Sequence, residues 1–263
     1  FGGSNGAYFN DTWIVQLSPS LAVFPAVVTG GAITGTGSLS NSGGGEIRGS
    51  GTVQSALTNA GGLVRATGTE ALTIANLFGN NTAGGELRVD EGATMNVQNA
   101  FNSSGTIVLG GPSASLNLNA VTNTGTLRGQ GRVTGAALNG GVVRAEAGTL
   151  TFASPGNTNT AAGRLEAGAG TQLFYTQGLA TNAGQIALTG GAFDNNNATL
   201  ANTGRIELRG MTEAVVITQN GPDDSDEQRM YTDGRPVRGA ELRVVREDGT
   251  PAGIGEEGEL RVR

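Results

Sequence analysis

The sequence predicts an all-β chain whose centre is a parallel β-solenoid of about nine coils, each about 20 residues long. The first observation is a degenerate repeat: an Asn, one to three small residues, a Gly, any residue and an aliphatic residue. It recurs at Asn41, Asn59, Asn81, Asn102, Asn123, Asn139, Asn159, Asn182 and Asn202. The second is its period, with steps of 16 to 23 residues between the aliphatic positions, which is typical of a solenoid. The third is composition: 46 Gly and only 5% aromatic residues exclude a conventional layered core.

Residues 1–32 are expected to be a strand or cap segment that leads into the first coil. Residues 21–32 are apolar, but Pro25 interrupts them, which favours a strand over a membrane segment. The chain has no run of 18 apolar residues, so no transmembrane helix is expected.

Residues 33–209 are predicted to form the solenoid, with two or three short strands in each coil. One strand follows the Asn-Gly turn, as at 85–89, and a second apolar alternation comes about eight residues later, as at 93–97 and 150–152. A third short run leads into the next Asn. Because alternation with period 2 places one side inward and the other outward, each coil should wrap an aliphatic interior and pair in parallel with the next coil, about 4.8 Å away.

The repeated Asn residues are expected to be structural. Asn tolerates left-handed turn conformations, hydrogen-bonds its own backbone and forms ladders when it is stacked. With this repeat, residues 33–209 resemble the right-handed β-helices of bacterial surface proteins, the autotransporter passenger and filamentous adhesin class. The resemblance implies a secreted or cell-surface bacterial protein with a structural or adhesive role.

The N-terminal segment carries a second resemblance. The Gly2-Gly3 pair, Asn10-Asp11 and the run from Trp13 to Leu17 resemble one kelch repeat of a β-propeller. The alternative is a single edge strand that caps or precedes the solenoid.

Residues 210–263 are expected to form a separate, β-rich segment. Their charge content sets them apart from the rest of the chain. Residues 1–210 hold 9 Arg and 10 acidic residues, whereas residues 211–263 hold 7 Arg and 12 acidic residues. Gly210-Met-Thr-Glu213, the stretch 232–245 and the stretch 256–263 resemble, in order, three motifs of adenylate-forming enzymes, the acyl-CoA synthetase superfamily. That resemblance implies that Thr212 and Glu213 contact nucleotide phosphates and Mg²⁺. However, the upstream phosphate loop and the catalytic Lys are absent, so no cofactor is expected.

Composition also excludes several chemistries. The chain has no Cys, no His and no Lys, and all 16 basic residues are Arg. It therefore has no thiolate or imidazole metal site, no Ser-His-Asp triad and no Schiff-base lysine. We predict no catalytic residue and no metal site, and the net charge of −6 argues against nucleic acid as a partner.

The candidate site with the most distinctive pattern is a column of arginines. If the repeat aliphatics point inward, the residue after each points outward, and five of these are Arg48, Arg65, Arg88, Arg128 and Arg144. Stacked at coil spacing, they predict a basic stripe that binds an anionic polysaccharide or cell-surface glycan. The alternative is that Glu46, Glu86 and Glu146 neutralise the stripe.

Carboxylates suggest two further kinds of site. Glu146 and Glu166 are 20 residues apart and could stack about 5 Å apart, as in retaining glycosidases, with plain ion pairs as the alternative. Asp90-Glu91 and the run 223–227 could hold calcium or be solvated loops.

The function that fits best is a structural or adhesive solenoid, not an enzyme. The alternatives are a fragment or fusion of an ATP-dependent adenylate-forming ligase, or a polysaccharide lyase or hydrolase. Because exposed solenoid ends pair with other chains unless they are capped, end-to-end self-association is also expected.

Overall fold

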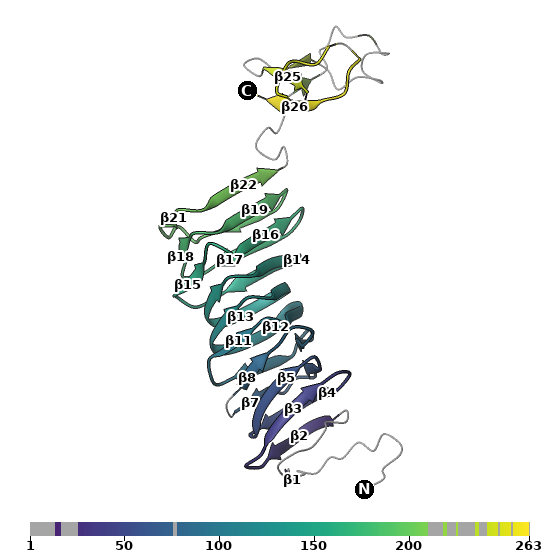
Figure 1. Ribbon diagram of the computed structural model, residues 1–263, viewed down its shortest axis with the longest axis vertical. Coiled ribbons are helices and arrows are strands. Elements are labelled where there is room, and N and C mark those ends of the chain that lie inside the picture. Colours follow the sequence, from purple (N-terminus) through teal and green to yellow (C-terminus); the bar gives the residue numbers. More distant parts are fainter. Residues whose placement is uncertain are drawn as a thin grey trace. The chain divides into compact units, whose positions relative to one another are not determined.

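The computed structural model describes residues 14–16, 26–75, 78–209, 218–219, 225, 235–236, 241–246, 248–253 and 255–262. The chain divides into two compact units, Phe1–Arg209 and Gly210–Arg263 (Figure 1). The predicted break near Gly210 lies at this division. The described residues are all-β, and those of the first unit form one sheet of 22 strands wound into a solenoid of about nine turns. The predicted fold class is therefore confirmed.

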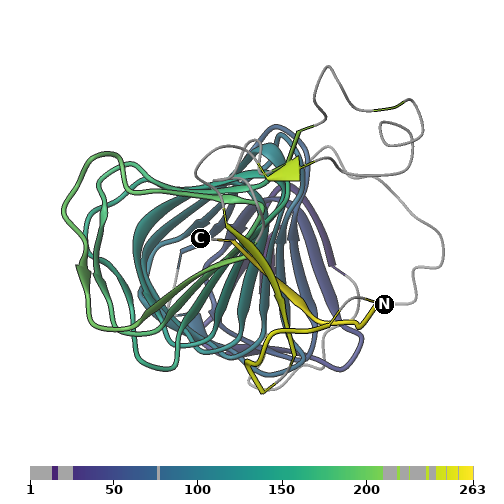
Figure 2. The ribbon, with the colours of Figure 1, turned by 90° about the horizontal axis from the view of Figure 1, so that it is seen from above.

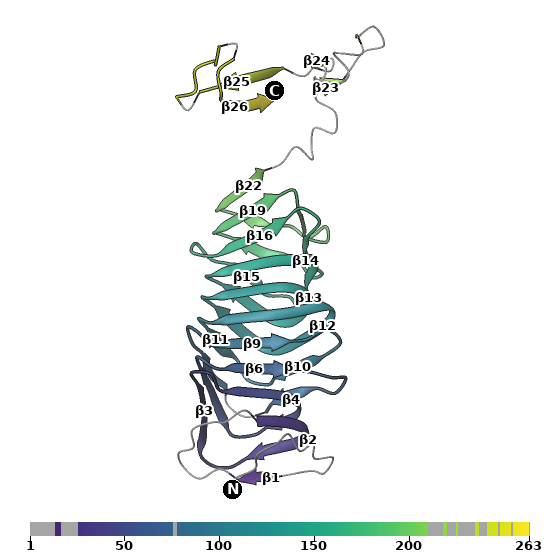
Figure 3. The same ribbon diagram turned by 90° about the vertical axis from the view of Figure 1, so that its right-hand side faces the viewer.

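Each coil contributes parallel strands to three faces. The arginine face contains the outward Arg residues of the repeat, and its strands lie one above another in Figure 3. It is formed by the first parts of β2 (Ala26–Thr34), β4 (Glu46–Val53), β12 (Thr106–Asn123), β13 (Thr126–Asn139) and β14 (Val142–Phe152), and by β6 (Leu63–Ala66), β9 (Glu86–Val89), β16 (Arg164–Gly168), β19 (Gln185–Thr189) and β22 (Arg205–Arg209).

The second face follows around the first corner of each coil. It is formed by the later parts of β2, β4, β12, β13 and β14, and by β1 (Ile14–Gln16), β7 (Leu72–Ile74), β10 (Thr94–Val97), β17 (Gln172–Tyr175) and β20 (Ala192–Asp194). Five strands therefore turn this corner without a break, since Gly residues with positive φ, such as Gly129 and Gly131, allow the bend.

The asparagine face completes each coil and contains the repeated Asn residues. It is formed by the ends of β12 and β13 and by β3 (Ser38–Ser42), β5 (Ala56–Ala60), β8 (Phe78–Asn81), β11 (Phe101–Ser103), β15 (Asn157–Asn159), β18 (Leu179–Asn182) and β21 (Ala201–Asn202). Seen from above, the strands of successive coils superpose around one interior (Figure 2).

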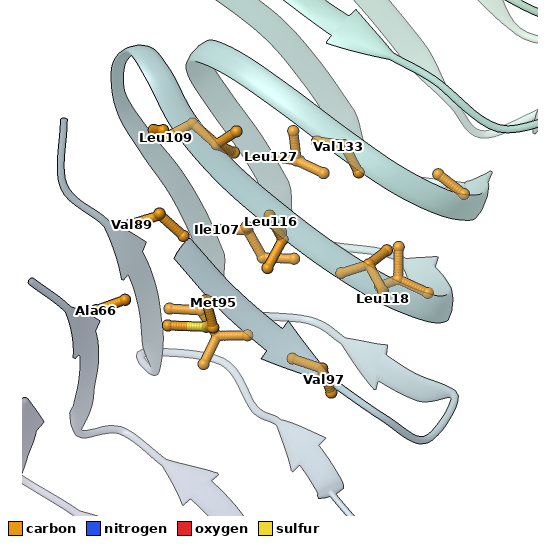
Figure 4. Packing of buried hydrophobic residues seen from close by; sticks show 14 of the residues in the cluster. Ala66, Val89, Met95, Val97, Ile107, Leu109, Leu116, Leu118, Leu127 and Val133 are labelled. Atoms are coloured by element: carbon orange, nitrogen blue, oxygen red, sulfur yellow. The ribbon is translucent and has the colours of Figure 1, made fainter. Parts of the chain in front are cut away.

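The interior is filled by rows of apolar side chains, one residue from each coil. On the arginine face the repeat aliphatics stack in register, and those from Ile47 to Ile186 are buried. On the second face Leu72, Met95, Leu116 and Val133 form a parallel row. Figure 4 shows these rows meeting in the centre of the coil. The predicted inward positions from Ile47 to Ile186 are thus buried, whereas Ile206 in the last coil is exposed, since each coil buries its aliphatics within itself and against its neighbours.

The interior becomes aromatic in the later coils. Phe152 and Tyr175 continue the second-face row and stack with their ring centroids 4.8 Å apart and their planes 8° apart. Phe193 tilts against Tyr175 at 5.6 Å. Burial of the phenol raises the pKa of Tyr175 above its ordinary value, because the ionised form loses its hydration.

A ladder of side-chain amides runs up the asparagine face. Each amide Nδ2 donates to the next side-chain oxygen, at 2.6–3.0 Å, in two segments. The first runs through Asn41, Asn59, Asn81 and Ser103, and the second runs through Asn123, Asn139, Asn159, Asn182 and Asn202. Apart from Asn202, these residues are almost fully buried, so the hydrogen bonds offset the desolvation of their polar groups.

The ladder corrects one position of the predicted repeat. Asn102 is exposed, and Ser103 occupies the ladder position, opposite Asn81 and Asn123. Both residues follow Phe101, so the pattern of small polar residues fitted either, and only the inward direction of Phe101 and Ser103 decides between them. Ser103 is too short to extend the ladder, which leaves the buried Oδ1 of Asn123 without a hydrogen bond.

The Gly of each repeat is required by close approach of other atoms: the Asn41 side chain at Gly45 and Gly62, and backbone carbonyl groups in the later repeats. A Cβ at Gly184 would lie 2.1 Å from the carbonyl oxygen of Gly163, and a Cβ at Gly204 would lie 2.0 Å from that of Gly184. Neither residue has positive φ, so the requirement comes from space and not from backbone conformation.

The N-terminal segment lies only partly within the described residues. Its described strand β1 pairs in parallel with β2, as Ile14 opposite Ala32, in the same sheet as the coils. This pairing fits the alternative of a strand that precedes the solenoid, and β2 itself runs across the predicted boundary between residues 32 and 33.

The second unit contains two short antiparallel pairs. β23 (Thr218–Gln219) pairs with β24 (Arg235–Pro236), and β25 (Leu242–Val245) pairs with β26 (Glu259–Val262). Its predicted β character therefore holds for the described residues.

Candidate functional site

The five arginines of the repeat form a column on the arginine face, as the alternation predicts. Strand register places Arg48 opposite Arg65, and Arg65 opposite Arg88. Val108 separates these three from Arg128 and Arg144, which are opposite each other. Glu166, Ala187 and Glu207 continue the column.

Carboxylates neutralise four of the five arginines. Arg128 pairs with Glu146 at 2.9 Å, and Arg88 pairs with Glu86 at 3.0 Å, as the alternative prediction held. Glu166 pairs with Arg144 at 2.6 Å and also with Arg164. The repulsion expected of stacked cations is thus offset by acids from the same or the following coil.

Asp90 is the carboxylate that the sequence reasoning missed. Its two oxygens accept hydrogen bonds from Nε of Arg65 at 2.9 and 3.0 Å, and Arg88 lies 3.6 Å away. This acceptor raises the pKa of the Arg65 guanidinium above its ordinary value. The sequence could have indicated this partner, because Asp90 lies two residues after Arg88 and a strand places both side chains on one side.

Arg48 differs from the other members of the column. Within the described part of the chain it forms no ion pair, and its side chain is exposed. Glu46, its predicted neutralising partner, forms no ion pair with it. Arg48 is therefore the column member whose guanidinium has no carboxylate partner among the described residues.

The predicted stack of Glu146 on Glu166 is wrong. Register places Arg144 opposite Glu166 and Ala145 opposite Ala167, so Glu146 lies beyond the paired positions. Strands β14 and β16 pair with an offset of 22 residues, as Val143 opposite Leu165, so the residue opposite Glu166 is two positions before Glu146. Each carboxylate instead pairs with an Arg, which is the plain ion-pair alternative.

The remaining acidic candidates have structural partners. Glu91 accepts a hydrogen bond from the backbone N–H of Ser113 at 3.1 Å, while Asp90 binds the arginines. Within the described residues, no group of three or more His, Cys, Asp or Glu side chains could hold a metal ion. Nor does any helix of that part have the length and apolar character needed to cross a membrane.

Two predicted positions cannot be placed. Thr212 and Glu213, the nucleotide-binding residues implied by the resemblance to adenylate-forming enzymes, lie outside the described residues, as does most of the acidic run 223–227.

The second face holds another outward column that the sequence reasoning did not single out. Register aligns Thr94, Ser115, Arg132, Thr151, Phe174 and Asp194. Arg132 is exposed, and Phe174 is half-buried with its ring on the outer side of β17, since its neighbours Leu173 and Tyr175 point inward. The sequence could have indicated the outward position of Phe174, because it lies between the two inward residues of the alternation Leu173-Phe174-Tyr175.

Comparison of the chain with protein-family models, curated proteins and solved structures found no match. The resemblances to bacterial surface β-helices, kelch repeats and adenylate-forming enzymes therefore stay predictions.

Proposed function

We propose that this solenoid is a structural or adhesive element of a secreted or cell-surface bacterial protein, and that its outward arginines contact anionic glycans. The observation that supports it most is the continuous register of the coils: apolar rows, the amide ladder and the ion pairs all repeat at strand spacing. Such a stack resists bending, because every coil is hydrogen-bonded to the next along its length.

The arginine column divides into two roles in this proposal. The four paired arginines form ion pairs within a coil or between neighbouring coils. Each pair contributes at most about 1 kcal/mol to the stability of the fold, because the side chains are partly exposed. Arg48 is the member of the column whose guanidinium no carboxylate of the described chain occupies.

The test is adhesion of the full chain, coupled to beads, to surfaces coated with polygalacturonate, with dextran or with nothing. We expect retention on polygalacturonate that decreases in about 0.5 M NaCl, since salt screens exposed charges. Equal release from all three surfaces would overturn the adhesive role.

Two controls address the alternative functions. Shortened polysaccharide in the supernatant would support a lyase or hydrolase. A rise in melting temperature with Mg-ATP that Glu213→Ala abolishes would support the ligase fragment.

A further inference from the structure

We infer that the second face carries a binding site for an acidic sugar, formed by Arg132, Thr151 and Phe174. The inference rests on the proposed contact with anionic glycans and assigns the principal contact to a face different from that of the arginine column. The three residues come from β13, β14 and β17 and are consecutive members of one outward column.

Their spacing suits an extended ligand that lies along the solenoid axis. Neighbouring strands are about 4.8 Å apart, so the Cα atoms of Arg132 and Phe174 are separated by about 10 Å, with Thr151 between them. The short Thr side chain leaves a low point between a cation and a ring. A sugar chain can therefore rest on Phe174 through its apolar C–H face and reach Arg132 with a carboxylate.

The polar groups of this column are available, unlike those beside it. In the adjacent outward row, Asn117 donates to Asn96 at 2.9 Å and accepts from Thr134 at 2.9 Å, so its amide is occupied. Within the described residues, the Arg132 guanidinium and the Thr151 hydroxyl form no hydrogen bond, and Arg132 forms no ion pair. The column neighbours of Arg132 are the uncharged Ser115 and Thr151.

Asp194 makes the two ends of the site differ in charge. It follows Phe174 in the column, and its carboxylate accepts from the backbone N–H of Asn196 at 2.8 Å. A ligand carboxylate is repelled at that end and attracted at the Arg132 end. The site therefore takes a uronate with its acid group toward Arg132 and its ring over Phe174.

The experiment is isothermal titration calorimetry of the full chain with an oligogalacturonate and with a neutral maltooligosaccharide of equal length. We expect the acidic ligand to bind more tightly, Arg132→Gln to weaken its binding about tenfold or more, and Phe174→Leu to weaken it about fivefold. Phe174→Tyr keeps a ring and should keep the affinity. Arg48→Gln is the comparison variant: it removes the unpaired guanidinium that the proposed function assigns to the arginine face, so the two losses show which face holds the ligand.

The outcomes separate the site from the proposed function. If Arg48→Gln weakens binding and Arg132→Gln does not, this site is wrong while the anionic-glycan function stands. An equal loss in both variants indicates diffuse charge attraction and also refutes the site. If the wild-type chain binds the acidic ligand no better than the neutral one, both proposals fail. Variants are compared only where their melting temperatures match that of the wild type.

Discussion

Replacing Ser103 with Asn should join the two segments of the amide ladder. Ser103 lies in register between Asn81 and Asn123, and the Nδ2 of Asn81 already donates to its Oγ at 3.0 Å. An Asn at this position can keep that bond through its Oδ1 and donate from its Nδ2 to the buried Oδ1 of Asn123, which now has no partner.

The other ladder positions show that the longer side chain has a place. Each ladder Asn up to Asn159 also donates to a backbone carbonyl of the following coil. Asn81 donates to Thr106 at 3.2 Å, and Asn123 donates to Val142 at 3.2 Å. By the same geometry, the new amide faces the carbonyl of Thr126, directly after Gly125 of the next coil.

The expected gain is about 1 to 2 kcal/mol in the free energy of unfolding. A net hydrogen bond contributes about 1 kcal/mol, and satisfying a buried acceptor removes a penalty of similar size, while the extra rotamer entropy offsets part of both. For a domain of this length, the melting temperature should rise by about 2 to 6 °C.

Urea unfolding followed by circular dichroism measures the change. Asn102→Ser is the matched control and should be neutral within about 0.5 kcal/mol, because Asn102 is exposed. A loss of stability in Ser103→Asn would refute the reasoning, since it would mean that the coil cannot take the larger side chain.

Three further predictions follow from the interior and the arginine face. Gly184→Ala should cost about 3 kcal/mol, because its Cβ would overlap the carbonyl of the preceding coil, whereas Gly168→Ala, whose Cβ meets nothing within 4 Å, should change the unfolding midpoint little. The raised pKa of Tyr175 means that its contribution to stability is complete below the unfolded value of 10.0 and is lost as pH rises toward the folded value; stability should fall by about 1.4 kcal/mol per pH unit above pH 10, and a Tyr175→Phe variant in parallel pH titrations should lack this component. Asp90→Asn should cost about 1 kcal/mol at low salt and less at high salt, since it weakens two ion pairs; an effect independent of salt in denaturation curves would indicate lost packing instead.

The repeat made the fold predictable because each element of it has a separate physical cause. The aliphatic position fills a row of the interior, the Asn pairs with its counterpart in the next coil, and the Gly makes room for a carbonyl oxygen. Each of these contacts forms between neighbouring coils, so the repeated pattern within one sequence is enough to predict them. The arginine column followed directly, since alternation fixes the side of the sheet on which each residue lies.

The misses share a different cause. The error at Asn102 and the false stack of Glu146 on Glu166 both concern register: Ser103 and not its neighbour Asn102 lies opposite Asn81, and an offset of 22 residues instead of 20 places Arg144 opposite Glu166. The pairing of Asp90 with Arg65 joins residues 25 apart, more than one period, which a search at fixed spacing overlooks.

The direction of the amide ladder has a consequence for assembly. Every one of its hydrogen bonds donates toward the later coil, from Asn41 to Asn59 and onward to Asn202. A coil stacked on the wrong neighbour would keep this bond, because each ladder Asn has both a donor and an acceptor. A second chain that approached in the opposite direction would instead bring two donors or two acceptors together at the end of the ladder. The ladder therefore gives the solenoid a polarity that the apolar rows lack, and it favours growth or end-to-end stacking in one direction.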